Sequence, residues 1–248
     1  MLIVGNWKAY VEKKAKAKSL ASTGKRLAST YARKHTVVIA PSAPYLGLLI
    51  TGKSKLGFAA QDLSLSTGGA ATGEVTASQL AELGVGYAII GHSERRAQGE
   101  TDVAVLEKVR HALAQKMTPI VCIGERERDT DAQYLHFVRA QIDSVFAPLS
   151  LKERLQIVIA YEPIWAIGKP TAEAIHPQEL TEMILYIRKQ LGNHVPGTVK
   201  QSVRVLYGGS VDGGNARSLA SGTGIDGFLV GRASTDSAEF TQIIRGVS

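Results

Sequence analysis

Cysteine is scarce in this sequence: Cys122 is the only thiol in a chain of 248 residues. A single thiol excludes an intrachain disulfide. Cys122 lies in the apolar run 119–123, so we expect a buried, inert thiol rather than a catalytic nucleophile. The six histidines show none of the spacings that are typical of a metal site, so we expect no bound metal.

Long hydrophobic runs are also missing. No apolar run is long enough to cross a membrane. Residues 1–5 have the pattern of a strand, whereas a secretory leader begins with a charged segment followed by an apolar one. Hydrophobic residues still make up 44% of the chain, which is enough for a sizeable core. We therefore expect a folded, cytoplasmic protein with no membrane partner.

Acidic residues are fewer than basic ones, which gives a formal net charge of +7. Such an excess raises the question of a nucleic-acid partner. The densest basic stretch, residues 13–18, has no aromatic residues between its lysines. It falls in a helical pattern whose apolar side is formed by Ala17, Leu20, Ala21, Leu27 and Tyr31. We therefore predict a solvated helix face and no nucleic-acid binding, and a positive field that attracts a small anionic substrate.

Short apolar runs alternate with amphipathic helical patterns along the whole chain. Eight runs predict strands, at residues 2–6, 36–40, 56–60, 87–90, 119–123, 156–161, 202–207 and 226–230. Between them, helical periodicity puts three sets on single faces: Val103, Leu106, Val109 and Leu113; Leu135, Val138, Ile142 and Val145; and Leu180, Ile184, Ile187 and Leu191. This pattern predicts one α/β domain, residues 1–248, folded as a (β/α)8 barrel. An open, doubly wound sheet is the alternative, because alternation alone does not close a sheet.

The sixth predicted strand leads directly to a carboxylate. Residues 157–160 are apolar without polar alternation, which is typical of a strand buried on both faces. Pro163 should end this strand just after Glu162. The apolar residues that follow disfavour the charged form of the carboxylate, which suits a general base near neutral pH. A salt-bridged glutamate at a strand end is the alternative interpretation.

Polar or glycine-rich motifs follow four further strands. The first strand is followed by Lys8, the fourth by His92, and the seventh and eighth by the turns 207–211 and 230–234. In a (β/α)8 barrel the carboxyl ends of the strands form one rim, where the active site lies. Each motif alone has an ordinary structural explanation, but together they predict one site on that rim.

These groups match the needs of proton abstraction next to a carbonyl. The two glycine-rich turns, with Gly168 on the sixth loop, present backbone N–H groups to a phosphate. Glu162 supplies the base, while His92 and Lys8 hold the oxygens of an enediolate. This chemistry needs no cofactor, and no glycine fingerprint for a nucleotide stands out in the sequence.

Six stretches resemble the triosephosphate isomerase family, in the family's order and along the whole chain. They are Asn6-Trp7-Lys8, Thr72-Gly73-Glu74, residues 91–96, Cys122-Ile123-Gly124-Glu125, residues 161–168 and Tyr207-Gly208-Gly209-Ser210. The resemblance implies a cofactor-independent TIM barrel that interconverts dihydroxyacetone phosphate and D-glyceraldehyde 3-phosphate in glycolysis and gluconeogenesis. It also implies a homodimer in which the loop that contains Thr72 enters the partner's site.

The resemblance also assigns roles to individual residues. It implies Glu162 as the base and His92 as a neutral electrophile, kept uncharged by the start of the following helix. Lys8 neutralises substrate charge, Asn6 helps to polarise the substrate oxygens, and Glu94 pairs with Lys8 in the open enzyme. The phosphate is held through backbone N–H groups of Gly168, Ser210, Gly231 and Arg232.

Three stretches depart from the family pattern. The lid reads Gly168-Lys169-Pro170-Thr171 where the family usually has Gly-Thr-Gly-Lys, so we place its flexible hinge at residues 171–174, beyond the rigid Pro170. Ala71 replaces a usual aromatic and Ala9-Tyr10 replaces Met-Asn, which predicts a looser dimer. Two alternatives for the function are an isomerase of a four-carbon ketose phosphate such as an erythrulose phosphate, and a non-catalytic protein that binds an anionic partner.

Overall fold

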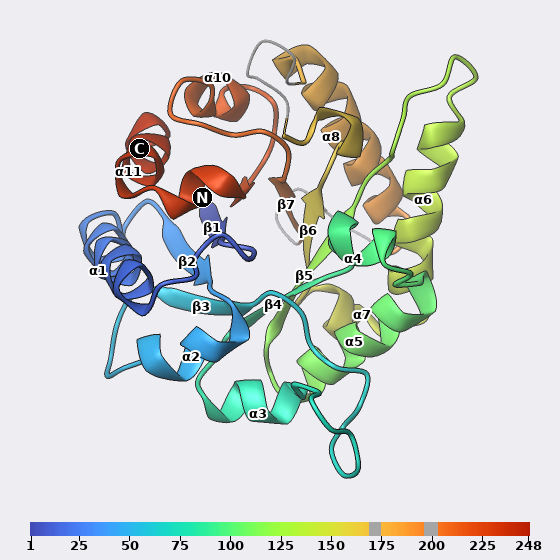
Figure 1. Cartoon of the computed structure of the whole chain (residues 1–248). Coiled ribbons are helices and arrows are strands. Elements are labelled where there is room, and N and C mark those ends of the chain that lie inside the picture. The colour runs from blue at the N-terminus through green and yellow to red at the C-terminus, as the bar shows by residue number, and fades with distance from the viewer. Residues whose placement is uncertain (169–174, 196–202) are drawn as a thin grey trace.

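A closed parallel barrel forms the centre of the molecule. The computed structural model describes residues 1–168, 175–195 and 203–248. Its eight strands are hydrogen-bonded in chain order, and the last pairs with the first. This closure confirms the predicted (β/α)8 barrel and excludes the open sheet (Figure 1). The strands are β1 (Leu2–Asn6), β2 (Thr36–Ala40), β3 (Gly57–Ala60), β4 (Tyr87–Ile90), β5 (Thr118–Ile123), β6 (Val158–Tyr161), β7 (Arg204–Tyr207) and β8 (Gly227–Val230).

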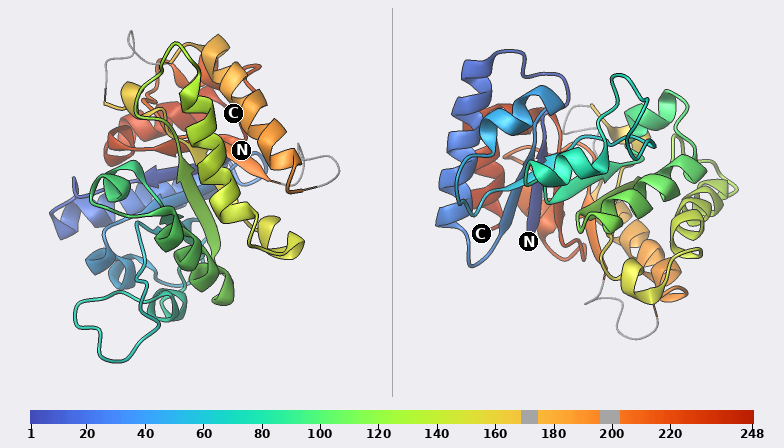
Figure 2. Two further views of the ribbon diagram at one scale, coloured as in Figure 1. Left: turned by 90° about the vertical axis from the view of Figure 1, so that its right-hand side faces the viewer. Right: turned by 90° about the horizontal axis from the view of Figure 1, so that it is seen from below.

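Helices surround the barrel on all sides, as the views in Figure 2 show. The helices are α1 (Lys14–Thr30), α2 (Ala43–Leu49), α3 (Ala77–Glu82), α4 (Ser93–Ala97), α5 (Asp102–Ala114), α6 (Gln133–Phe146), α7 (Leu151–Arg154), α8 (Pro177–Gly192), α10 (Ala216–Ala220) and α11 (Ser237–Gly246). Two 3-10 turns, η1 (Ile164–Ala166) and η3 (Arg232–Thr235), follow β6 and β8. Among the helices of the described ranges, none is long and apolar enough to span a bilayer.

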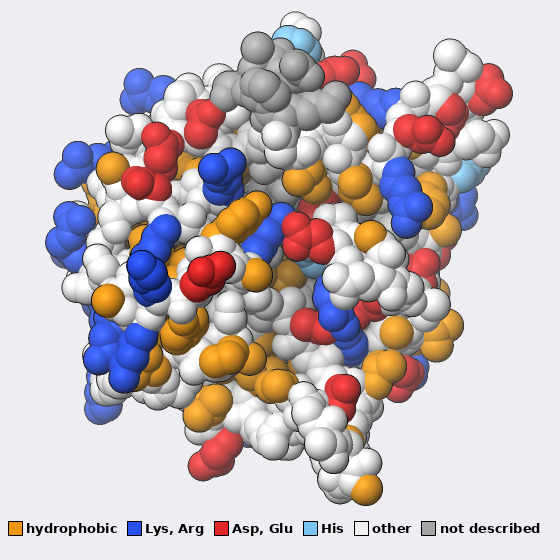
Figure 3. Space-filling view, viewed as in Figure 1, with side chains coloured by type: hydrophobic (Ala, Val, Ile, Leu, Met, Phe, Trp, Pro, Cys, Tyr) orange, Lys and Arg blue, Asp and Glu red, His pale blue; other side chains and the backbone are white. Residues whose placement is uncertain are grey.

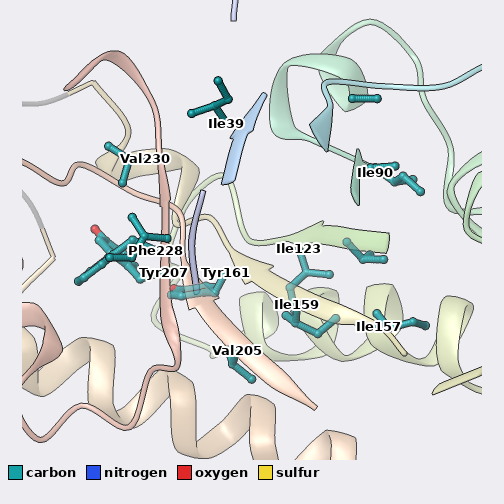
Figure 4. Packing of buried hydrophobic residues seen from close by; sticks show 14 of the residues in the cluster. Ile39, Ile90, Ile123, Ile157, Ile159, Tyr161, Val205, Tyr207, Phe228 and Val230 are labelled. Atoms are coloured by element: carbon teal, nitrogen blue, oxygen red, sulfur yellow. The ribbon is translucent and has the colours of Figure 1, made fainter. Parts of the chain in front are cut away.

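The strands separate two hydrophobic layers because their side chains alternate between the two faces. Inward-facing residues fill the barrel, and they include Val4, Ile120, Cys122, Ala160 and Leu229. Outward-facing residues pack against the helices, and Figure 4 shows ten of them by label: Ile39, Ile90, Ile123, Ile157, Ile159, Tyr161, Val205, Tyr207, Phe228 and Val230. Continued past Val4 and Ala160, the alternation points Asn6 and Glu162 into the top of the barrel.

Strand boundaries agree with the sequence prediction for β1, β2 and β4. The predicted sixth strand began at Gln156, but β6 begins at Val158. The reason is local: the N–H groups of Gln156 and Ile157 are used by α7, where they donate to Glu153 O and Arg154 O. Ser202, the predicted start of the seventh strand, lies outside the described residues.

The helix faces agree with prediction in α6 and α8, but not at the start of α5. Val103 was predicted to face the core, yet 73% of it is exposed. The buried face of α5 instead carries Lys108, only 4% exposed, beside Val105 and Val109. Lys108 is buried because its ammonium group bonds the carboxylates of Asp62 and Glu100. The basic stretch of α1 lies on its exposed face, as predicted.

Candidate active site

A cavity of about 570 Å³ opens at the carboxyl ends of the strands. Figure 3 shows basic, acidic and histidine side chains meeting near the middle of this face. The predicted site residues that line the cavity are Asn6, Lys8, His92, Glu162, Gly168, Ser210, Gly231 and Arg232. Glu94 joins them through Lys8, whose Nζ lies 2.7 Å from Glu94 Oε1. The barrel therefore brings together the residues that the sequence analysis singled out, apart from Thr72.

Glu162 sits at the floor of this cavity and is only 2% exposed. Its N–H continues the strand ladder by donating to Ile123 O at 2.8 Å, and Pro163 then ends β6. The carboxylate Oε2 accepts the N–H of Ser93 at 3.0 Å. The other oxygen, Oε1, lies 3.3 Å from Nε2 of His92. The sixth strand thus delivers a buried carboxylate to the turn after the fourth strand.

His92 caps the start of α4, and this fixes the roles of its ring nitrogens. Its Nδ1 accepts the N–H of Glu94 at 3.2 Å. In a neutral imidazole the other nitrogen, Nε2, then carries the hydrogen. That Nε2–H points toward Glu162 at the cavity floor. The geometry therefore suits a neutral imidazole that donates a hydrogen bond into the site.

Lys8 has a strained backbone, with a φ of 47° in the left-handed region that most residues avoid. Contacts on both sides stabilise this conformation. Its N–H donates to Asn6 Oδ1 at 3.0 Å, while its carbonyl accepts from Ser42 Oγ at 3.0 Å and from Gln61 Nε2 at 2.9 Å. Strain that is held by so many bonds is typical of functional sites, and here it aims the ammonium group into the cavity.

The glycine turn after β7 leaves room for the Glu162 side chain. A Cβ added at Gly208 would lie 2.9 Å from Glu162 Cγ, closer than carbon atoms pack. Gly124, after β5, is restricted more severely, because a Cβ there would overlap the carbonyl oxygen of Glu162. These two glycines, which follow the strands on either side of β6, are therefore explained by their close approach to Glu162.

The loops after β6 and β7 are fastened together at the cavity edge. Ser210 Oγ donates to Ala166 O at 2.9 Å, and Asn215 Nδ2 donates to Ser210 O at 3.0 Å. Gly168 follows with a φ of 75°, a conformation that glycine adopts without strain. The predicted lid hinge at residues 171–174, and the Lys169 and Pro170 that precede it, lie outside the described residues.

Sequence reasoning missed the network that anchors the segment before Gly168. Glu125 is 1% exposed, and its Oε1 accepts from the Trp165 indole and the Tyr161 hydroxyl, each at 2.8 Å. The guanidinium of Arg128 lies over the Trp165 ring, 4.8 Å from its centroid. Burial, and then the charge of Glu125, raise the pKa of Tyr161 far above its usual range. The acidic residue Glu125, two positions after the end of β5, was the sequence signal for this network.

Cys122 is buried inside the barrel, as predicted. Burial raises the pKa of its thiol, and the nearby Glu162 carboxylate raises it further. The thiol therefore stays protonated and unreactive. Across the described part of the chain, no cluster of three or more His, Cys, Asp or Glu side chains is arranged to hold a metal ion.

Comparison with known proteins agrees with this geometry. Residues 1–247 match the sequence model of the family Triosephosphate isomerase. The triosephosphate isomerase of Ralstonia nicotianae is 40% identical, over 98% of this chain and 97% of the relative. The corresponding enzyme of Alcanivorax borkumensis is 40% identical over 98% and 96%, and that of Thermus thermophilus is 38% identical over 99% and 98%. This chain therefore belongs to the triosephosphate isomerase family.

Proposed function

We propose that this protein is an isomerase that interconverts dihydroxyacetone phosphate and D-glyceraldehyde 3-phosphate through an enediolate. Family membership over the whole chain supports the reaction. The single observation that carries it is the buried Glu162 carboxylate, 3.3 Å from His92 Nε2, in a cavity that Lys8 also lines. We further propose that the enzyme works in glycolysis and gluconeogenesis, in the cytoplasm.

The proposed reaction begins with proton abstraction. Glu162 takes a proton from the carbon next to the substrate carbonyl, as a general base. The carbonyl oxygen gains negative charge in this step, and Nε2–H of His92 donates to it. Asn6 helps to polarise the same oxygens, and the ammonium of Lys8 neutralises their charge. A proton also passes from the hydroxyl oxygen of the first carbon to the former carbonyl oxygen, and Glu162 returns its proton to the neighbouring carbon, which completes the isomerisation without a cofactor.

The substrate phosphate would lie against the glycine-rich side of the cavity. Gly168, Ser210, Gly231 and Arg232 all line that side, and their backbone N–H groups are the proposed donors. Backbone donors suit a phosphate because they are fixed by the fold and carry partial positive charge.

Substrate binding must rearrange one contact of the free enzyme. Glu94 holds the ammonium of Lys8 at 2.7 Å. The substrate competes with this contact, since the same ammonium must face the reacting atoms. The contact between Lys8 and Glu94 is the one that the resemblance implied for the open enzyme.

The substrate is tested by a coupled assay that offers dihydroxyacetone phosphate and an erythrulose phosphate side by side. We expect kcat/KM for the triose to exceed that for the tetrose by at least about 10-fold, since one misplaced reacting atom costs on the order of 100-fold. Equal or better turnover of the tetrose would overturn the triose assignment. The family and the relatives named above carry the triose name, which favours the first outcome.

We propose a homodimer whose interface includes the segment between β3 and α3. This segment projects from the barrel (Figures 1 and 2). Thr72 lies exposed in this segment. Leu65 and Val75 expose 50% and 37% of their surface. A cavity of about 570 Å³ lies beside it, lined by both of these residues and by Arg95. Exposed apolar residues on a projecting segment favour burial against a second copy.

A further inference from the structure

The active-site cavity has two cationic side chains in its described lining, those of Lys8 and Arg232. They differ in their partners. The ammonium of Lys8 is bound to Glu94 at 2.7 Å. The guanidinium of Arg232 is exposed and forms neither a hydrogen bond nor an ion pair with any residue that the structure describes. Arg232 therefore holds the uncommitted positive charge of the cavity wall.

The backbone next to Arg232 lies close to the end of the Lys8 side chain. Arg232 is the first residue of η3 and directly follows Gly231. A Cβ placed on Gly231 would lie 3.7 Å from Lys8 Cε. Ser210, at the turn after β7, lines the same cavity. A phosphate held by this wall is therefore within the field of both cations.

A second cavity, of about 920 Å³, adjoins the active-site cavity and shares Asp212, Arg232 and Ala233 with it. Carboxylates line this second cavity, but each is already a hydrogen-bond acceptor. Asp236 accepts the N–H groups of Ala238 and Glu239, and Glu239 accepts that of Gly213. Asp212 accepts two backbone N–H groups. Arg232 thus lines both the active-site cavity and a neighbouring cavity whose acidic side chains already accept backbone N–H groups.

We propose that the side chain of Arg232 binds the substrate phosphate, as a second cation beside Lys8 and in addition to the backbone N–H groups. This inference rests on the proposed function and deepens it. A guanidinium matches a phosphate with two parallel N–H donors, and such charge-assisted pairs are among the strongest hydrogen bonds in proteins. Lys8 must leave Glu94 to meet a substrate, whereas Arg232 has no partner to leave among the residues that the structure describes. The side chain therefore makes the enzyme more selective for substrates that carry a phosphate.

The test compares Arg232→Ala and Arg232→Lys with a matched control, Lys16→Ala. Lys16 lines the neighbouring cavity but is not in the described lining of the active-site cavity, so its loss changes the net charge equally without removing a phosphate contact. Calorimetry measures the Kd of inorganic phosphate at fixed ionic strength, and kinetics gives the ratio of kcat/KM for dihydroxyacetone phosphate to that for glyceraldehyde. We expect Arg232→Ala to raise the Kd about 10-fold and to lower the kcat/KM ratio about 10-fold. Arg232→Lys should retain part of the phosphate affinity and part of the selectivity. For Lys16→Ala, both quantities should stay within about twofold of the parent.

Two outcomes would overturn the inference. The first is an Arg232→Ala variant whose Kd and kcat/KM ratio stay within about twofold of the parent. The second is an equal loss of phosphate affinity in Lys16→Ala, because the effect would then be one of general charge. Arg232→Gln keeps part of the stem and replaces the alanine variant if that variant does not fold. Failure of the proposed function has a different signature. A parent that binds inorganic phosphate through Arg232 but does not isomerise the triose would refute the isomerase alone.

Discussion

The main-chain N–H of Ser93 donates a 3.0 Å hydrogen bond to Oε2 of Glu162, and this bond ties the sixth strand to the turn that carries His92. The donor belongs to the backbone, so its position is set by the fold and not by a rotamer. The carboxylate and the imidazole are thereby held on one side of the cavity before any substrate arrives. The arrangement allows the backbone donor to be removed without touching a catalytic side chain.

Ser93→Pro removes this donor in a position where proline is tolerated. Ser93 is the first residue of α4, and His92 has φ −53° and ψ 142°, angles that a residue before proline can adopt. We expect kcat/KM to fall about 10-fold or more, because a hydrogen bond to a charged group contributes about 1.5 to 3 kcal/mol. Ser93→Ala keeps the N–H and is the matched control, with activity close to the parent. Equal activity of the two variants would show that the bond does not position Glu162.

Stability should decrease at alkaline pH because buried acidic groups resist deprotonation in the folded state. Burial raises the pKa of the Cys122 thiol above its ordinary value of 9.0. Burial and Glu125 raise the pKa of the Tyr161 hydroxyl above 10.0. Well below pH 9 both groups are protonated in the folded and unfolded chains, so their full contribution is present. Above pH 9 for the thiol, and above pH 10 for the tyrosine hydroxyl, the unfolded chain releases a proton that the folded chain keeps, and each group then lowers stability by about 1.4 kcal/mol per pH unit.

Urea unfolding of the parent and of Cys122→Ala between pH 8 and about 10.5 measures this dependence. The alanine variant is expected to be less stable at pH 8, because it leaves a cavity. Its stability should nevertheless decline less steeply between pH 9 and 10. In that range the Cys122 thiol of the unfolded parent loses its proton, whereas the Tyr161 hydroxyl does not yet do so. Parallel pH profiles for the two proteins would mean that the thiol does not contribute.

The homodimer should be looser than its relatives, since Ala71 lies half-buried where the family usually has an aromatic anchor. Aromatic residues are the usual energetic anchors of interfaces. Analytical ultracentrifugation at falling concentration is the measurement. We expect a dimer at micromolar concentration that dissociates in the nanomolar range. A monomer at high micromolar concentration contradicts the dimer, and a dimer that persists at low nanomolar concentration contradicts its looseness.

Much of the barrel was predictable because each buried strand reads as a short apolar run, and β1, β2 and β4 have the predicted bounds. Local pattern failed where long-range charge decides burial. Lys108 is buried because it forms ion pairs with Asp62 and Glu100, which lie outside its helix, and no periodic pattern in the sequence indicates such contacts. Val103, predicted to be buried, lies on the exposed side of the same helix.

The side chains of the candidate site were predictable as a set, because strand ends of a parallel barrel share one rim. The contacts between these side chains were not predictable from the sequence. The hydrogen bond between Ser93 and Glu162 uses a backbone group, which carries no sequence signature. Tyr10 lines the cavity although it resembles a surface residue, with 52% of it exposed. The catalytic and phosphate-binding roles of these residues stay predictions until they are measured.

The most direct test of the account is the rate of triose phosphate isomerisation by Glu162→Asp. Aspartate keeps the charge but withdraws the carboxylate by about one methylene, and a displacement of roughly 1 Å can cost on the order of 100-fold. The parent should interconvert dihydroxyacetone phosphate and glyceraldehyde 3-phosphate, and the variant should lose about 100-fold in kcat while it still binds inorganic phosphate. A variant whose turnover stays within about threefold of the parent would contradict the role of Glu162 as the base.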